Sequence, residues 1–171
     1  MSTMSILACP VCGGALTTPT NSSGQYLCPQ GHSYDRARQG YLNLLVAQHK
    51  KSRAPGDGTE MVMARRRFLE QDHYLPIASA FADFVEKQLG HHNQDLQIAD
   101  VGCGEGYYTN KLQQHLSGNN RFYGIDIARD AVKLAARSYP DITWLVASGG
   151  RLPLLGNRLD AIVSLFTPVM P

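Results

Sequence analysis

The stretch Leu96-Gln97-Ile98-Ala99-Asp100-Val101-Gly102-Cys103-Gly104-Glu105-Gly106-Tyr107-Tyr108 decides the fold of this 171-residue chain. An apolar run that reaches Asp100 predicts a buried strand, and the glycines after it predict a tight turn into a helix. Their spacing is G-x-G-x-G, whereas a dinucleotide-binding turn has G-x-G-x-x-G, which lets a pyrophosphate sit on the helix N-terminus. Glu105 occupies the place where that phosphate would lie. We therefore expect a ligand without phosphate, close to Gly102 and Gly104.

The residues after this turn continue the strand and helix alternation of a parallel α/β sheet. Further strands are predicted at Arg121–Asp126, Trp144–Ser148 and Asp160–Pro168. Ligands of such sheets bind at the carboxyl ends of the strands, where Asp126 can accept the hydroxyl groups of a ribose and Ser148 can contact an adenine edge. A turn without ligand, and a helix-capping role for Asp126, are the alternatives.

Three of the four cysteines lie in the first 28 residues, in the pattern C-x2-C-x15-C-x3-H formed by Cys9, Cys12, Cys28 and His32. Three thiolates and one imidazole match a tetrahedral structural zinc site, with no position left for water. We expect residues 1–40 to form a zinc knuckle or ribbon that folds on metal binding. A reduced dithiol or a disulfide is the alternative.

Positive charge is concentrated in residues 36–67, which hold eight of the 16 Lys and Arg against two acids. The loop around Pro55 is basic and rich in turn residues, so it suits an arm that contacts a polyanion such as RNA, and a solvated linker is the alternative. The candidate contacts are Lys50, Lys51 and Arg53 in the loop and Arg65, Arg66 and Arg67 beyond it.

Helical spacing of apolar residues predicts two helices within residues 41–94, which we otherwise interpret as a basic connector. Thr59 is expected to cap the first, and the second is expected to begin at Pro76 and stop at Gly90. The expected core positions are Met61, Ala64 and Phe68 in the first helix and Ile77, Phe81, Phe84, Val85 and Leu89 in the second.

The composition, 43% hydrophobic and 18% charged, is that of a globular protein and excludes disorder, collagen and coiled coil. The sequence has no run of eighteen apolar residues, and its first residues lack the basic start of a signal peptide. We expect a soluble, cytoplasmic protein with no membrane partner.

The segment Asp100–Gly106, with Asp126, resembles motif I and the following acid of class I S-adenosylmethionine-dependent methyltransferases. The chain from about Cys9 to Pro168 resembles more closely the bacterial 23S rRNA guanine-N(1) methyltransferases. That closer resemblance rests on the zinc-ligand pattern together with Gly40–Leu45, Gln48–Asp57 and Ala64–Leu69.

The resemblance implies methyl transfer from S-adenosylmethionine to N1 of a guanine in a 23S rRNA hairpin, without DNA as a partner. It also implies a zinc module that recognises the RNA, a Rossmann-like domain that holds the methyl donor, and a homodimer. Tyr74 matches a tyrosine that covers the cofactor. The expected cofactor-binding residues are Tyr74, Asp100, Gly102, Gly104, Glu105, Asp126 and Ser148, and Phe166 and Pro168 are substrate-side candidates for a stacking platform.

The family continues beyond Pro168 for roughly another half domain. We therefore expect residues 95–171 to be the N-terminal half of the cofactor-binding domain and the chain to be C-terminally truncated. The competing hypotheses are a non-catalytic zinc-dependent RNA-binding protein, an inactive truncated methyltransferase, an NAD-dependent oxidoreductase, and a methyltransferase for a small molecule or a protein.

Overall fold

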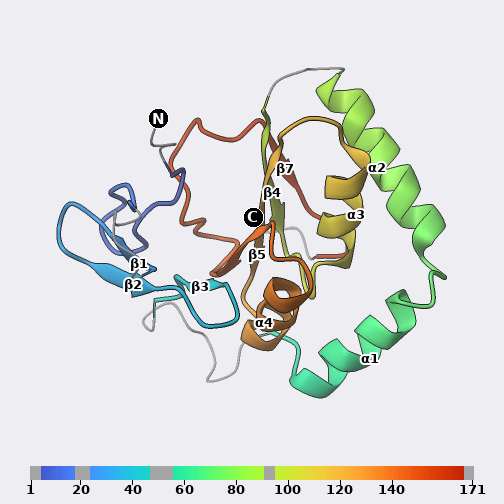
Figure 1. Ribbon diagram of the computed structural model, residues 1–171, viewed down its shortest axis with the longest axis horizontal. Helices are drawn as coiled ribbons and strands as arrows, with labels where there is room; N and C mark the ends of the chain where they lie inside the picture. The colour runs from blue at the N-terminus through green and yellow to red at the C-terminus, as the bar shows by residue number, and fades with distance from the viewer. Residues whose placement is uncertain (1–4, 18–23, 47–55, 91–94, 168–171) are drawn as a thin grey trace.

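A five-stranded parallel sheet forms the centre of the computed structural model, which describes residues 5–17, 24–46, 56–90 and 95–167 (Figure 1). Its strand order is β3-β6-β5-β4-β7. The strands are β3 (Leu42–Asn43), β4 (Gln97–Val101), β5 (Arg121–Asp126), β6 (Thr143–Val146) and β7 (Ala161–Val163). The α/β class is confirmed, and a strand lies within each of the four segments expected after residue 95. The last strand is shorter than expected, because β7 ends at Val163 and the described residues 164–167 are not in a strand.

The fifth strand, β3, comes from the region interpreted as connector. Leu42 pairs with Leu145 of β6, and the Leu44 amide donates to the Val146 carbonyl at 2.9 Å. Leu42 and Leu44 are buried on either side of the exposed Asn43, which is the alternation of a half-buried strand. Residues 42–44 are therefore hydrogen-bonded into the sheet.

Helices cover one face of the sheet: α2 (Leu75–Leu89), α3 (Tyr107–His115) and α4 (Arg129–Ser138), with α1 (Thr59–Leu69) packed on α4 (Figure 1). The core between these helices and the sheet includes Ile98, Leu112 and Trp144, of which Trp144 is only 1% exposed. None of the described helices is long and apolar enough to span a membrane.

The opposite face of the sheet is covered by the described part of residues 1–40, which we call the zinc module (Figure 1). It contains the antiparallel hairpin of β1 (Gln25–Leu27) and β2 (Ser33–Asp35). Leu7 and Leu16 of this module share a buried cluster with Leu145 of the sheet.

The connection between β6 and β7, residues 147–160, is fully described and contains no helix. It is bound to the zinc module by two backbone hydrogen bonds of 2.8 Å, from the Ala8 amide to the Pro153 carbonyl and from the Leu155 amide to the Ile6 carbonyl. Because a parallel sheet must be buried on both faces, the zinc module takes the place that a crossover helix ordinarily fills.

The buried faces of the first two helices differ from the expectation. In α1 the buried residues are Val62 and Leu69, whereas Met61 is 59% exposed and Phe68 is also exposed. Gly58, rather than Thr59, is the N-cap residue of α1. The Thr59 hydroxyl donates to Asp130 instead, so it ties the start of α1 to α4.

The second helix was predicted with nearly correct ends, since α2 is followed by Gly90 as its C-cap residue. Of its five expected core residues, Val85 is buried and Phe81 and Leu89 are partly buried against the core. The prediction is wrong for Phe84, which is 61% exposed, and for Ile77, and it missed the buried Ala78 and Ala82. Small side chains bring two helices close together, so the alanine stripe packs against α3.

Candidate functional site

The glycine turn after β4 is held against the end of β5. The amides of Gly102 and Cys103 both donate to the Ile125 carbonyl, at 2.8 and 3.2 Å. Gly102 and Gly104 have φ values of +84° and +56°, which residues with a Cβ rarely adopt. The turn lies at the carboxyl ends of two neighbouring strands. A Cβ at Gly102 would lie 2.0 Å from the Thr167 hydroxyl, so Gly102 packs closely, whereas one at Gly104 would meet, among the described residues, only the Arg65 guanidinium, at 3.8 Å.

Gly106 serves packing rather than ligand approach. A Cβ at Gly106 would lie 2.5 Å from the Trp144 ring, and one at Gly124 of β5 would lie 2.1 Å from the same ring. Cys103 is buried in the same core cluster as this ring. The Trp144 ring therefore packs directly against the turn and against β5.

The Asp126 carboxylate has a fixed orientation at the end of β5. Its Oδ2 accepts the Gly104 amide at 2.9 Å, and its Oδ1 accepts the Ala128 amide, just before α4, at 2.8 Å. Each oxygen keeps a second lone pair for another donor. Local backbone binding and ligand binding are thus compatible roles for Asp126.

A cavity of about 710 Å³ opens between these elements and α1, a volume typical of small-molecule sites. Its lining includes six of the seven expected cofactor residues, which are Tyr74, Gly102, Gly104, Glu105, Asp126 and Ser148, and also Phe166. The remaining expected residue, Asp100, does not line it.

Asp100 lies in the interior and fixes the helix that follows the turn. It is buried and accepts the Thr109 hydroxyl of α3 at 2.5 Å. Burial raises its pKa to about 6, with Asp126 and Glu105 adding like charge and the Thr109 hydrogen bond acting in the opposite direction.

The cavity has an acidic side. Burial also raises the pKa of Glu105, while backbone hydrogen bonds and the positive charges of Arg65 and Arg66 lower it. Asp126 lines the same cavity, and the two carboxylates together disfavour a phosphate and favour a cationic ligand.

Aromatic side chains form the rim of the cavity. The ring of Tyr74 lies 5.2 Å from that of Phe68 and 6.2 Å from that of Phe166, and Phe166 lies 5.6 Å from Tyr108, all between centroids. Phe166 is 68% exposed. The sequence prediction missed Phe68 and Tyr108 as rim residues, and Pro168 lies outside the described residues.

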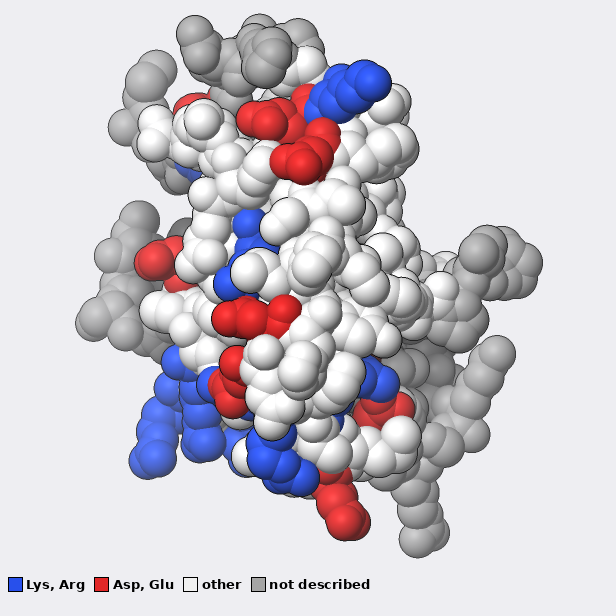
Figure 2. Space-filling model, turned by 90° about the vertical axis from the view of Figure 1, so that its right-hand side faces the viewer, with Lys and Arg blue, Asp and Glu red and all other residues white. Residues whose placement is uncertain are grey.

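The structure separates the three arginines of α1. Arg65 lines the cavity and pairs with Asp57 at 2.7 Å. Arg66 is held by Glu70 at 2.6 Å and by the Ser138 hydroxyl at 2.7 Å. Arg67 is exposed. Figure 2 shows Lys and Arg side chains gathered toward the lower end of the face that it presents. Three other candidate RNA contacts, Lys50, Lys51 and Arg53, lie outside the described residues.

The four expected metal ligands meet at one point of the zinc module. Cys12 Sγ lies 3.6 Å from Cys28 Sγ, and His32 Nδ1 lies 3.3 and 3.6 Å from the sulfurs of Cys28 and Cys9. All four ligand atoms lie within 4.8 Å of one another. Tetrahedral zinc places such sulfur pairs about 3.8 Å apart and sulfur–nitrogen pairs about 3.6 Å apart, so the four residues fit the ion.

Neighbouring groups stabilise the metal-ligand sulfurs. The His32 amide donates to Cys28 Sγ at 3.3 Å, and the Tyr34 hydroxyl lies 3.2 Å from Cys9 Sγ. Burial acts to raise the pKa of the Cys9 thiol, but hydrogen bonds from Tyr34 and from backbone amides outweigh it and bring the pKa to about 6. Cys9 is therefore readily available as a thiolate.

Two family models match the chain, one in its N-terminal part and one in its C-terminal part. Residues 7–53 match the model described as RlmA, N-terminal, and residues 98–170 match a methyltransferase domain. A 23S rRNA (guanine(748)-N(1))-methyltransferase of Streptomyces fradiae is 31% identical over 167 residues, which are 96% of this chain and 56% of that relative. A Micromonospora griseorubida protein provisionally named a 23S rRNA (guanine-N(1)-)-methyltransferase is 34% identical over 95% of this chain and 58% of its own length.

Over nearly all of its own length, the chain is similar to proteins named 23S rRNA guanine-N(1)-methyltransferases. It spans less than three fifths of the length of these relatives. Its fold is similar to that of a solved structure from Methanococcus maripaludis, which is provisionally named an S-adenosylmethionine-dependent methyltransferase. The TM-score is 0.57 at 15% identity, covering 69% of this chain and 55% of that one.

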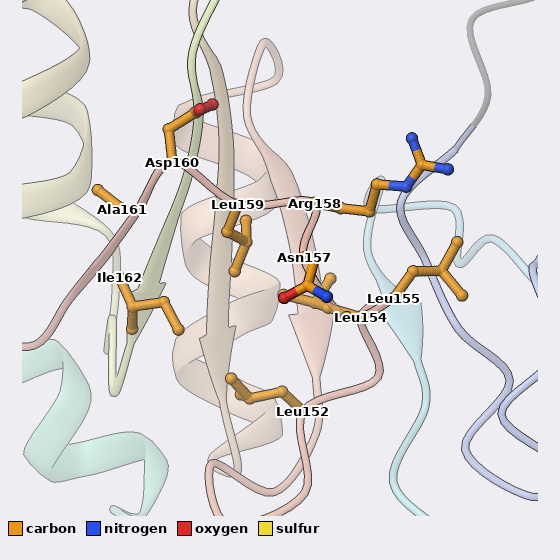
Figure 3. Close-up of a pocket in the computed structure, with 10 residues that line it drawn as sticks. Leu152, Leu154, Leu155, Asn157, Arg158, Leu159, Asp160, Ala161 and Ile162 are labelled. Atoms are coloured by element: carbon orange, nitrogen blue, oxygen red, sulfur yellow. The ribbon is translucent and has the colours of Figure 1, made fainter.

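A second cavity, of about 420 Å³, lies in this methyltransferase fold along the connection between β6 and β7. Figure 3 shows Leu152, Leu154 and Leu159 beside the sheet, with the Arg158 side chain directed away from them. None of the described candidate residues lines this cavity, so it is separate from the site at the strand ends.

Proposed function

We propose that this chain supplies the zinc module and the donor-binding half of an enzyme that methylates N1 of a guanine in a 23S rRNA hairpin. The observation that carries the proposal is the cavity at the glycine turn, where the Asp126 carboxylate is fixed at the end of β5. It occurs in a chain whose relatives are named for this reaction.

S-Adenosylmethionine supplies an electrophilic methyl group on a positively charged sulfur. We assign the ribose hydroxyl groups to Asp126, whose oxygens keep free lone pairs, and the adenine edge to Ser148. Gly104 leaves room for the ligand at the turn, and Glu105 contributes negative charge near the sulfonium. Tyr74 covers the bound donor from the N-terminus of α2.

The acceptor nitrogen is protonated and lies in the Watson–Crick edge, so the guanine must be unpaired or extruded before it reacts. The aromatic rim of Phe68, Tyr74, Tyr108 and Phe166 provides rings on which an extruded base can stack. Holding donor and acceptor in line and close together supplies most of the rate enhancement in such a displacement.

In the same proposal, the basic residues 36–67 and the zinc module bind the RNA hairpin. The protein acts as a homodimer in the cytoplasm. The domains proposed are residues 1–40, 41–94 and 95–171, with the strand at 42–43 joined to the last of them.

Neutralising Lys50, Lys51 and Arg53 together should flatten the salt dependence of hairpin affinity, because fewer counterions are released. An unchanged slope contradicts an electrostatic role for this loop.

Calorimetric titration of S-adenosylhomocysteine, the product of the donor, into the zinc-loaded protein tests the donor site. We expect binding that weakens at least tenfold in Asp126→Ala, because two ribose hydrogen bonds to a charged group are lost. Ser164→Ala, in the same region but outside the cavity lining, is the matched control. Absence of binding by the unmodified protein, together with retained hairpin binding, refutes the proposal in favour of a non-catalytic RNA-binding protein.

A further inference from the structure

Arg65 is the one Lys or Arg among the described residues that line the large cavity. The same lining contains three carboxylates, Asp57, Glu105 and Asp126. A single guanidinium in an otherwise acidic cavity indicates a ligand that carries one anionic group among cationic ones.

S-Adenosylmethionine has this distribution of charge. Its sulfonium and ammonium groups are positive, and its α-carboxylate is the only anionic group. We infer that Arg65 binds the α-carboxylate of the methionine part of the donor and that Asp57 holds the guanidinium in position. The inference rests on the proposed function and adds to it a residue that the sequence had indicated for RNA.

Arg65 is directed toward the glycine turn. An ideal Cβ built on Gly104 would lie 3.8 Å from Arg65 Nη1, so the guanidinium faces the part of the turn whose amide binds Asp126. This places a positive charge within reach of a ligand that lies across Gly104. A guanidinium has five N–H donors in a planar fork, so it can bind Asp57 on one edge and a second carboxylate on another.

Asp57 is itself anchored. A Cβ at the preceding residue, Gly56, would lie 2.5 Å from the Ala128 side chain, so the backbone there rests directly on the start of α4. Asp57 then meets Arg65 at 2.7 Å. The pair thus connects α1 to the element that follows Asp126, and it keeps the arginine at the cavity when the ligand is absent.

The neighbouring Arg67 provides the contrast. It belongs to the same helix and is exposed, but it does not line the cavity. Arg67 is therefore a matched control for the loss of one positive charge from α1.

The test compares S-adenosylhomocysteine with its decarboxylated analogue, which lacks only the α-carboxylate. Both are titrated calorimetrically into the zinc-loaded unmodified protein, Arg65→Gln and Arg67→Gln. We expect Arg65→Gln to weaken binding of S-adenosylhomocysteine by about 10- to 100-fold, the usual effect of losing a charged hydrogen-bonded pair. Affinity for the decarboxylated analogue should change less than about twofold, which also shows that the variant is folded.

Each other outcome overturns the inference. Equal weakening of both ligands in Arg65→Gln means that the arginine acts on the shape of the cavity, and unchanged binding with a loss of hairpin affinity means that it contacts RNA. Failure of the unmodified protein to bind either ligand refutes the proposed function as well. A preserved preference for the carboxylated ligand in Arg65→Gln refutes only the role of Arg65.

Discussion

Removal of zinc should unfold the donor-binding sheet as well as the zinc module. The module covers much of one face of the sheet, where Val101, Ile125 and Leu145 are buried in a common cluster with Leu7 and Leu16. The fully described segment 147–160 contains no helix that could cover this face in place of the zinc module.

The size of the effect follows from the side chains that would be exposed. Burial of a Val, Leu or Ile side chain contributes about 1.5–3 kcal/mol, so three of them contribute roughly 5–9 kcal/mol. A domain of this size is stable by about 5–15 kcal/mol in total. Loss of the zinc module therefore removes enough free energy to unfold the remainder or to leave it marginal.

The single tryptophan provides the assay. Trp144 is 1% exposed and belongs to the cluster on the helical face, away from the zinc module, so its fluorescence reports on the rest of the fold. We expect its emission to shift to longer wavelength as a chelator removes zinc, and also in Cys12→Ala, but not in Val11→Ala, whose side chain is 57% exposed. Release of zinc without a change in Trp144 emission or in the melting temperature would refute the coupling.

Two further substitutions test the support of the glycine turn. Gly124→Ala places a Cβ 2.1 Å from the Trp144 ring, so it should lower the free energy of unfolding in urea by about 1–3 kcal/mol or more, and a normal urea midpoint contradicts this packing. Because burial raises the pKa of Asp100 to about 6, the folded state holds its proton more tightly than the unfolded state, and this contribution to stability is lost as the pH rises through 6. Asp100→Asn, which keeps an acceptor for Thr109, should therefore gain about 1 kcal/mol relative to the unmodified protein between pH 5 and 7, and a constant difference in free energy of unfolding over this range contradicts the shift.

Strands and the glycine turn could be predicted because their causes are local. An apolar run bounded by turn residues is visible in the sequence, and so is a carboxylate at the end of the second strand. The β3 strand was not recognised as part of the sheet because it has two residues and its partner, β6, lies about a hundred residues away. Short strands depend on their neighbours more than on their own composition.

The buried faces of α1 and α2 could not be derived from hydrophobicity alone. Large apolar residues such as Met61 and Phe84 are exposed, whereas Ala78 and Ala82 are buried because α2 approaches α3 closely. The partner of a helix decides which of two apolar faces it buries, and that partner is not visible in a single segment.

The candidate site, like the fold, could be predicted only in part. Residues from the turn and the strand ends were found from the sequence, but Arg65, Phe68 and Tyr108 reach the cavity only through the packing of α1 and α3. A run of three arginines indicated a polyanion. It gave no indication that one of them turns toward a small-molecule cavity, because adjacent helical residues point about 100° apart and only the fold determines what each direction meets.

Residues from both sides of the domain boundary expected at residue 40 pack into one buried cluster. The cysteines and the histidine before it belong to the zinc site, yet Leu7 and Leu16 pack beneath the sheet and β3, just beyond the boundary, forms one edge of that sheet. A zinc module attached by a linker would leave the sheet unchanged when its metal is lost. We expect a zinc module that packs on one face of the sheet to make metal binding a condition for the cavity at the glycine turn, because this turn follows a strand whose Val101 is buried in the shared cluster.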